Sequence, residues 1–208
     1  MKILEPKVTG VVEHSFLDAF NECDYHNKLF LDSVSGNFEI SDCSFDSCVF
    51  KDFDFCDIVL SGVDLVDVVF ENCDLSNKCF DNCSIDRVKF INCKMIGTSF
   101  IDSSIRDVVF DSCVSKYINF SSAKISKVCI SDCDFSFMRF YETDLKNIEF
   151  NDVNLGGSEI FDTSLNGLDV SSCKIEGLSI DFDSLRGLII DKFQSIDLVN
   201  MLGVNFKS

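Results

Sequence analysis

Residues 81–100 read DNCSI DRVKF INCKM IGTSF, four groups of five that each end on a large apolar side chain. The same phase extends far in both directions. Every fifth residue from Ile40 to Ile190 is Phe, Leu, Ile, Met or Val, and Ser115 is the exception. Because the phase never slips, we expect a repeat architecture with no inserted loop in this span.

The residue two places before each apolar centre is usually small or β-branched, as at Cys83, Val88 and Cys93. Residues two apart in an extended chain point to the same side. Each unit is therefore expected to send one large and one small side chain inward and to leave three mostly polar residues outside. A period of five fits neither a helix (3.6) nor a simple strand (2). It indicates one short extended segment and one turn, repeated.

The centres also alternate with a ten-residue period. One set of centres carries Phe, and the other carries smaller aliphatic residues. Cysteines favour the second set as the small inward partner. Large beside small fills a narrow interior. Four cysteines spaced twenty apart are expected to stack in one column: Cys73, Cys93, Cys113 and Cys133.

The ends of the repeat need covers, because open ends expose unpaired backbone. We expect residues 1–19 to cap one end, residues 20–190 to form the repeat domain, and residues 191–208 to form a C-terminal helix and tail. Ser195 is the expected N-cap and Gly203 the C′ glycine. The helix is either a lid or a dimer contact, and its apolar content favours the dimer. The expected interface residues are Phe193, Ile196, Val199, Met201 and Leu202.

The net charge of −17 disfavours nucleic acid and anionic membrane as partners and favours a basic partner, although acids also serve solubility. Residues 1–75 carry net −12, residues 76–130 net +3 and residues 131–208 net −8. Residues 1–10 lack a basic region followed by an apolar run, and no 18-residue apolar stretch occurs. We therefore expect a cytoplasmic protein whose twelve cysteines are free thiols.

Outward acids recur at twenty-residue spacing in two columns, which begin at Glu22 and at Asp32. Asp, Asn and Ser suit tight turns, which explains the Asn and Ser positions and part of the acids. The remaining acids near the C-terminal half form the candidate partner-binding face. Its residues are Asp132, Asp134, Glu142, Asp144, Asp152, Glu159 and Asp162.

Catalytic and cofactor motifs are absent from the sequence. The histidines, His14 and His26, suggest no triad, and there is no phosphate loop or nucleotide fingerprint. No Cys-x-x-Cys pair occurs, so the cysteines are interpreted as small hydrophobes; a metal- or redox-responsive role is a weaker alternative. We expect no enzyme activity, cofactor or metal. Lys78 falls at an inward position, and a local distortion or bulge is expected to let it escape.

The uninterrupted repeat, with units such as Ser41–Phe45 and Glu142–Lys146, resembles the pentapeptide-repeat proteins. The C-terminal segments Ser164–Asp169, Ser184–Leu188 and Leu198–Val204 resemble the Qnr-like branch, especially its chromosomal Gram-positive members. This resemblance implies four units per coil of 20 residues, that is, an all-β, right-handed quadrilateral β-helix with a short C-terminal α-helix. It also implies a homodimer joined through C-terminal helices.

The same resemblance implies a function. Qnr-like proteins bind type II topoisomerases (DNA gyrase and topoisomerase IV) and protect them from fluoroquinolones by DNA mimicry. Gram-negative members carry projecting loops that contribute to protection, and this chain has no break for such loops. The alternative is a structural or adaptor repeat protein whose partner is another protein and whose acids serve only solubility.

Overall fold

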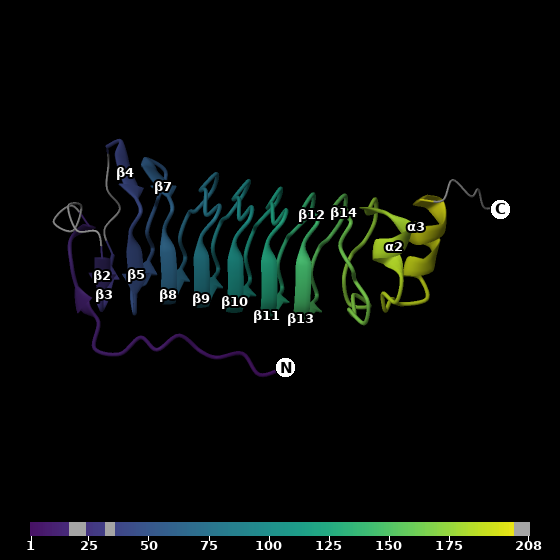
Figure 1. Cartoon of the computed structure of the whole chain (residues 1–208), viewed down its shortest axis with the longest axis horizontal. Helices are drawn as coiled ribbons and strands as arrows, with labels where there is room; N and C mark the ends of the chain where they lie inside the picture. Colours follow the sequence, from purple (N-terminus) through teal and green to yellow (C-terminus); the bar gives the residue numbers. More distant parts are fainter. Residues whose placement is uncertain (17–23, 32–35, 202–208) are drawn as a thin grey trace.

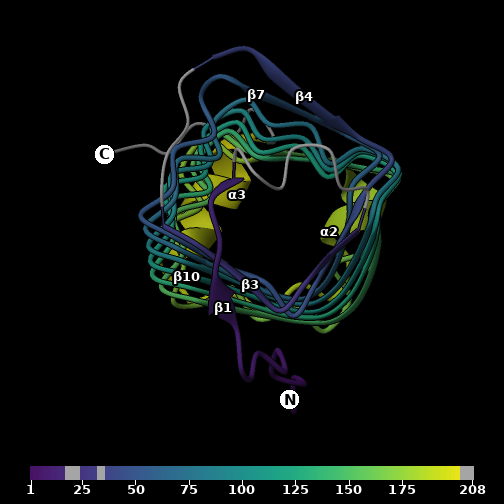
Figure 2. The ribbon, with the colours of Figure 1, turned by 90° about the vertical axis from the view of Figure 1, so that its left-hand side faces the viewer.

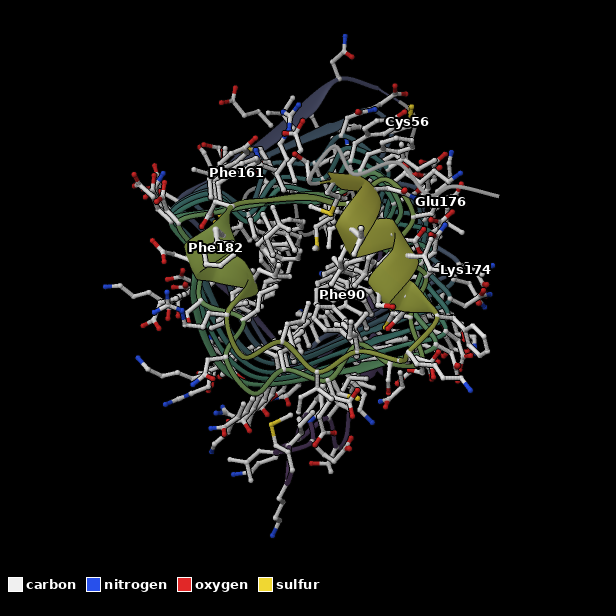
Figure 3. The ribbon with its side chains drawn as sticks, turned by 90° about the vertical axis from the view of Figure 1, so that its right-hand side faces the viewer. Cys56, Phe90, Phe161, Lys174, Glu176 and Phe182 are labelled. Atoms are coloured by element: carbon white, nitrogen blue, oxygen red, sulfur yellow. The ribbon has the colours of Figure 1, made fainter. Side chains whose placement is uncertain are left out.

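The computed structural model describes residues 1–16, 24–31 and 36–201. The predictions for residues 17–19, Leu202 and Gly203 lie outside these ranges. The chain forms a right-handed, four-sided β-helix drawn out into a rod (Figure 1). Seen along the rod, successive coils superpose as a square (Figure 2), and side chains point into its interior (Figure 3). In the described ranges, no helix is long and apolar enough to cross a membrane.

All strand pairs of the coil body are parallel with a register of twenty residues, as between Ile105 and Ile125 or Phe70 and Phe90. The largest sheet wraps around two adjacent sides and the corner between them. It contains β1 (Val12–Glu13), β2 (Asp24–His26), β3 (Lys28–Phe30), β5 (Ser44–Asp46), β6 (Val49–Lys51), β8 (Asp64–Glu71), β9 (Ser84–Ile91), β10 (Ser104–Asp111), β11 (Lys124–Ser131) and β13 (Asp144–Asn151).

A third side carries two smaller sheets. One consists of β4 (Phe38–Ser41) and β7 (Ile58–Ser61), and the other of β12 (Arg139–Tyr141), β14 (Glu159–Phe161) and β15 (Ser179–Ile180). The fourth side is held by isolated bridges in the same register, such as Asp134 with Asn154. The twenty-residue coil implied by the resemblance is thus confirmed.

The interior follows the predicted alternation. Phe50, Phe70, Phe90 and Phe110 stack at ring-centroid distances of 5.0–5.1 Å. On the opposite side Phe100 stacks at 5.2 Å on the Phe of the coil before it and of the coil after it. Ser115 is fully buried in the place of an apolar centre, and its hydroxyl has no hydrogen-bond partner. The Phe ladders explain why the phase tolerates so few exceptions.

The small inward residues also donate hydrogen bonds between coils. Cys93 Sγ donates to the carbonyl oxygen of Phe70 at 3.5 Å, and Thr143 Oγ1 to that of Phe120 at 3.0 Å, each 23 residues earlier in the chain. Cys, Ser and Thr alternate at this position because all three are small donors that bind the coil below. Interpreting the cysteines as small hydrophobes was therefore incomplete. Each cysteine of the described ranges is a free thiol.

Lys78 corrects a second prediction. It stays at its inward position, only 9% exposed, and no bulge releases it. Its Nζ donates to the carbonyl oxygens of Ile58 at 2.7 Å and Cys56 at 3.2 Å. The ammonium thus takes the place of the small donors, and these hydrogen bonds offset part of the cost of burying it.

At the N-terminal end, the predicted cap of residues 1–19 is wrong for its first half. β1 pairs with β3, and the Phe16 ring lies 5.4 Å from that of Phe30, so residues 12–16 cover the end. Residues 1–10, here called the strap, instead run back along the outside of the rod, below the coils in Figure 1.

At the C-terminal end, α2 (Phe182–Leu185) and α3 (Gln194–Met201) lie across the last coil (Figure 3). Asp183 stands two residues before Leu185, where the repeat would turn it inward; α2 instead leaves Asp183 exposed and buries Ser184. Ser195 is not the N-cap, since it lies inside α3. Asp191 Oδ1 accepts from the Phe193 nitrogen at 2.8 Å, and Gln194 Oε1 accepts from the Asp191 nitrogen at 2.7 Å. This is a reciprocal capping box.

Candidate acidic interface

The corners of the square coil decide which polar residues face outward. Nearly every corner residue from 42 to 187 has a left-handed backbone, for example Asp132 at φ 53° and Glu142 at φ 51°. Asn, Asp and Gly tolerate this conformation best. Both acidic columns seen in the sequence are therefore corner columns, and the turn explains much of their composition. What the turn does not explain is the choice of Asp and Glu over Asn and Gly.

Four corner columns run along the rod. The Asp132 corner includes Asp52, Asn72, Asn92, Ser112, Asp132 and Asp152. The Glu142 corner includes Asp42, Asn82, Asp102, Ser122, Glu142 and Asp162. The strap corner includes Asp67, Arg87, Asp107, Lys127 and Asn147. The aromatic corner includes Asn77, Gly97, Tyr117, Phe137 and Gly157. Following the chain around one coil, the two acidic corners are diagonally opposite, and so are the strap and aromatic corners.

Four of the eight bases of the middle segment lie at or beside the strap corner: Arg87, Lys89, Arg106 and Lys127. Arg87 forms ion pairs with Asp67 at 2.7 Å and with Asp86, and Arg106 pairs with Asp86 at 2.7 Å. The Arg87 guanidinium holds the pKa of Asp67 below its ordinary value, and the backbone N–H of Lys7 adds to this effect. Arg87 and Arg106 are thus both engaged with carboxylates at and beside this corner.

The strap covers this charged corner. The backbone nitrogen of Lys7 donates to Asp67 Oδ1 at 2.9 Å, and that of Leu4 to Asp107 Oδ1 at 3.0 Å. Glu5 forms an ion pair with Lys89 on the adjacent column. The other side of the rod, which runs from the Asp132 corner over the aromatic corner to the Glu142 corner, carries no strap.

The seven predicted acids do not share one face. Asp132 and Asp152 lie on one acidic corner, and Glu142 and Asp162 lie on the diagonally opposite one. Asp134 and Glu159 project from the two strap-free sides between these corners, on opposite sides of the aromatic corner. Asp144 lies just beyond the Glu142 corner, in β13. The structure therefore replaces a single acidic face with two adjacent sides bordered by acidic corners.

Around the Asp132 corner, Asp132, Asp134 and Asp152 line a shallow groove of about 480 Å³ that Lys174 also borders. Burial opposes the ionisation of Asp134, but hydrogen bonds from Ser136 and from Lys116 outweigh it and hold the pKa of Asp134 below its ordinary value. Asp132 and Asp152 form no ion pair with the described residues, so their charges are available to a partner.

Around the Glu142 corner, two acids are already engaged. Asp144 pairs with Lys146 at 2.7 Å, and Glu159 accepts from Arg139 at 3.2 Å and from the Tyr141 hydroxyl at 2.6 Å. The Glu159 carboxylate raises the pKa of Tyr141 above its ordinary value. Glu142 and Asp162 themselves have no ion-pair partner in the described part of the chain.

The sequence analysis overlooked the aromatic corner. Tyr117 and Phe137 hold the left-handed conformation at φ 60° and 61°, where most other corners carry Asn, Asp, Ser or Gly. Their rings stack at 4.9 Å on the outside of the rod. The signal was available in the sequence: two successive aromatics stand twenty residues apart in a column that is otherwise polar or glycine.

The predicted dimer residues are placed as follows. Phe193 is 69% exposed and Ile196 is 49% exposed. Val199 and Met201 are partly buried, and Met201 packs against the core. Leu202 lies outside the described residues. The structure thus separates α3 into an inner side that covers the last coil and an outer apolar side without a cover among the described residues.

Comparison with known families matches residues 63–132 to a pentapeptide repeat region and residues 39–77 to pentapeptide repeats in eight copies. Both matches fall on the coils whose twenty-residue register is described above. Residues 39–132 are pentapeptide repeats of this family. Comparison with curated protein sequences gives no match.

Solved structures of pentapeptide-repeat proteins are similar to the chain. Two are trypsin-treated variants of QnrB1, a plasmid-mediated fluoroquinolone resistance protein. One is 21% identical, with a TM-score of 0.39 and coverage of 88% of this chain and 90% of that one. The other is 18% identical, with a TM-score of 0.42 and coverage of 94% and 96%. HetL, involved in heterocyst differentiation regulation in the cyanobacterium Nostoc, is 11% identical, with a TM-score of 0.41 and coverage of 81% and 90%.

Proposed function

We propose that this pentapeptide-repeat protein is a DNA mimic that binds type II topoisomerases, DNA gyrase and topoisomerase IV, and protects them from fluoroquinolones. The observation that carries the proposal is the separation of charge around the rod. Arg87, Lys89 and Arg106 are paired at or beside the strap corner. The corner acids Asp132, Asp152, Glu142 and Asp162 border the strap-free sides and have no ion-pair partner among the described residues. A slim rod with exposed carboxylates in columns suits a groove built for the phosphates of duplex DNA.

The C-terminal sequence supplies the second support. Ser164–Asp169, Ser184–Leu188 and Leu198–Val204 resemble the Qnr-like branch, whose members act on these enzymes.

The proposal includes a homodimer joined at the C-terminal ends. Three large apolar side chains are exposed there: Phe182 at 71%, Phe193 at 69% and Ile196 at 49%. A two-fold contact would bury these side chains on both copies. It would also place the two segments of net −8 next to each other.

Supercoiling by purified gyrase with ciprofloxacin, at increasing amounts of the protein, tests the proposal. We expect supercoiling to recover. Asp132→Asn/Asp152→Asn should weaken the recovery severalfold, since exposed charges contribute roughly 0.2–1 kcal/mol each. Asn keeps the left-handed turn. Asp42→Asn/Asp52→Asn removes one acid from each acidic corner at the N-terminal end; it is the charge-matched control and should change little. If the protein neither restores nor inhibits supercoiling at any ratio, the proposal is wrong.

An adaptor role for another protein partner is the second candidate. The exposed rings of Tyr117 and Phe137 at the aromatic corner favour this role, because DNA mimicry alone does not need exposed rings. In that case gyrase would be unaffected, while the rod would still bind a basic protein.

A further inference from the structure

The aromatic corner and the side next to it carry two ring stacks on the outside of the rod, here called the aromatic strip. The first stack is Tyr117 on Phe137, and the second is Tyr141 on Phe161, at 5.5 Å and 9°. Tyr117 is 57% exposed and Phe137 is 45% exposed. Bulky side chains rarely adopt the left-handed conformation of these two corner residues, and the rings recover little burial in return.

In the first stack, the Phe137 ring lies next to Gly157 of the following coil. A Cβ on Gly157 would lie 2.6 Å from the Phe137 ring, so only glycine leaves room for the ring. The next residue of the column, Gly177, also lacks a side chain. The ring face that does not stack on Tyr117 is therefore bordered by backbone alone within its column.

One exposed acid, Glu176, lies at this corner. Glu176 precedes Gly177, is exposed, and forms no ion pair with the described residues. Its carbonyl oxygen accepts from the Gly157 nitrogen at 2.9 Å, which fixes its backbone beside the glycine. Figure 3 places Glu176 and Phe161 at the two edges of the same side of the rod. Between them, Glu159 accepts from the Tyr141 hydroxyl at 2.6 Å and is paired with Arg139 at 3.2 Å, so Glu176 is the acid of this side that has no ion pair among the described residues.

Ring faces beside carboxylates select cations. A planar guanidinium stacks on an aromatic face and donates to a carboxylate with its edge, which an ammonium does less well. Nucleic acid also stacks on aromatic platforms, but the net charge of −17 and the acidic corners on both sides oppose it. We propose that the aromatic strip is a docking surface for arginine side chains of a basic protein partner. This inference deepens the proposed function, since it names how a basic enzyme surface would be recognised.

A fluorescein-labelled octa-arginine peptide tests the inference without any topoisomerase. By anisotropy at physiological salt, it should bind the intact protein more tightly than octa-lysine. Tyr117→Asn/Phe137→Asn should weaken octa-arginine binding about fivefold and remove its advantage over octa-lysine, as expected for loss of one cation–π contact. The thermal midpoint should stay equal or rise, because Asn fits the left-handed corner. Val114→Ser, an exposed apolar residue of the adjacent side, is the matched control and should bind as the wild type does.

The intrinsic fluorescence supplies a second readout. The chain has no Trp and three Tyr, of which Tyr25 is buried while Tyr117 and Tyr141 lie in the strip. Octa-arginine should therefore change the tyrosine emission of the intact protein. Equal affinity of octa-arginine for wild type and Tyr117→Asn/Phe137→Asn would overturn the inference. So would a fall in mass from dimer to monomer in that variant, because a second copy would then be the occupant.

The same variant in the gyrase assay separates this inference from the proposed function. If the wild type protects gyrase and the variant does not, both stand. If the wild type fails to protect while octa-arginine binding still depends on the strip, the topoisomerase proposal fails and the docking surface stands. If both proteins protect equally, the strip is not the contact and the inference is wrong.

Discussion

At the scale of single residues, the Phe ladders make the most direct prediction. Phe100 is fully buried, and its ring stacks at 5.2 Å on Phe80 and on Phe120. Phe100→Ala should lower the free energy of unfolding by about 3–5 kcal/mol, because the rod cannot collapse around the cavity. Urea denaturation followed by circular dichroism measures this change. An unchanged midpoint would mean that the ladder contributes nothing to stability.

Lys78 allows a sharper test, because it is a charged side chain held only by backbone oxygens. Lys78→Met keeps most of the volume but leaves the carbonyl oxygens of Ile58 and Cys56 without the ammonium. Leaving buried acceptors unsatisfied costs about 1–3 kcal/mol. We expect destabilisation by that amount in the same denaturation experiment. A more stable Lys78→Met would show instead that burying the ammonium costs more than its hydrogen bonds return.

At the scale of elements, α3 combines two roles that mutation can separate. Gln194 is buried, and its Nε2 donates to the carbonyl oxygens of Cys173 at 2.7 Å and Val170 at 2.9 Å. Gln194→Ala should lower the thermal midpoint, at a cost of about 1–3 kcal/mol, and leave the mass unchanged. Phe193→Asp/Ile196→Asp changes only the outer side. It should reduce the mass by light scattering to that of a 23.4 kDa monomer without lowering the midpoint of the coil.

The elements also show which structures the sequence could predict. A strict period of five fixes the coil, since each Phe must face inward to be buried. The strap was not predictable in this way, because residues 1–10 have no periodicity and are held through backbone N–H groups that any residue supplies. Ser195 and Asp191 are both suitable N-caps by type. The last coil decides between them, because its Cys173 carbonyl oxygen accepts a hydrogen bond from Gln194 and so fixes where the helix begins.

The candidate site divides in the same way. The twenty-residue spacing correctly grouped acids into columns, but it did not place those columns around the square. Asp132 and Glu142 are ten residues apart and therefore diagonally opposite, so no single face holds both. Tyr117 and Phe137 carry no charge, so the charge pattern does not reveal them; their signal is an aromatic residue type at a left-handed corner, and the sequence alone does not show that backbone conformation.

At the scale of the whole molecule, the buried thiols predict an alkaline limit to stability. Burial raises the pKa of Cys48 and of Cys83 from an ordinary value of 9.0 to about 11. The unfolded chain thus loses these protons near pH 9, while the folded rod keeps them until near pH 11. The folded state binds more protons in this window, so its stability should be constant below pH 9 and fall from there to pH 11.

Urea midpoints measured between pH 7 and pH 11 check this expectation. Cys48→Val/Cys83→Val is the control, since Val occupies the same inward position in other coils, as at Val63 and Val88. Its stability should decline less steeply above pH 9 than that of the wild type. Parallel curves would show that the thiols do not set the limit.

The strap has a consequence for how such a rod can change its length during evolution. Leu4 and Lys7 are three residues apart, yet they bind Asp107 and Asp67, which lie two coils apart. Three extended residues advance about 10 Å, and two coils advance about the same distance. Three residues of strap therefore span about the same length of the rod as two coils. A duplication that adds one coil of twenty residues preserves every inward position, but it moves the strap's acidic partners out of step. Growth of this rod within the strapped region should therefore proceed by pairs of coils, accompanied by three more residues of strap.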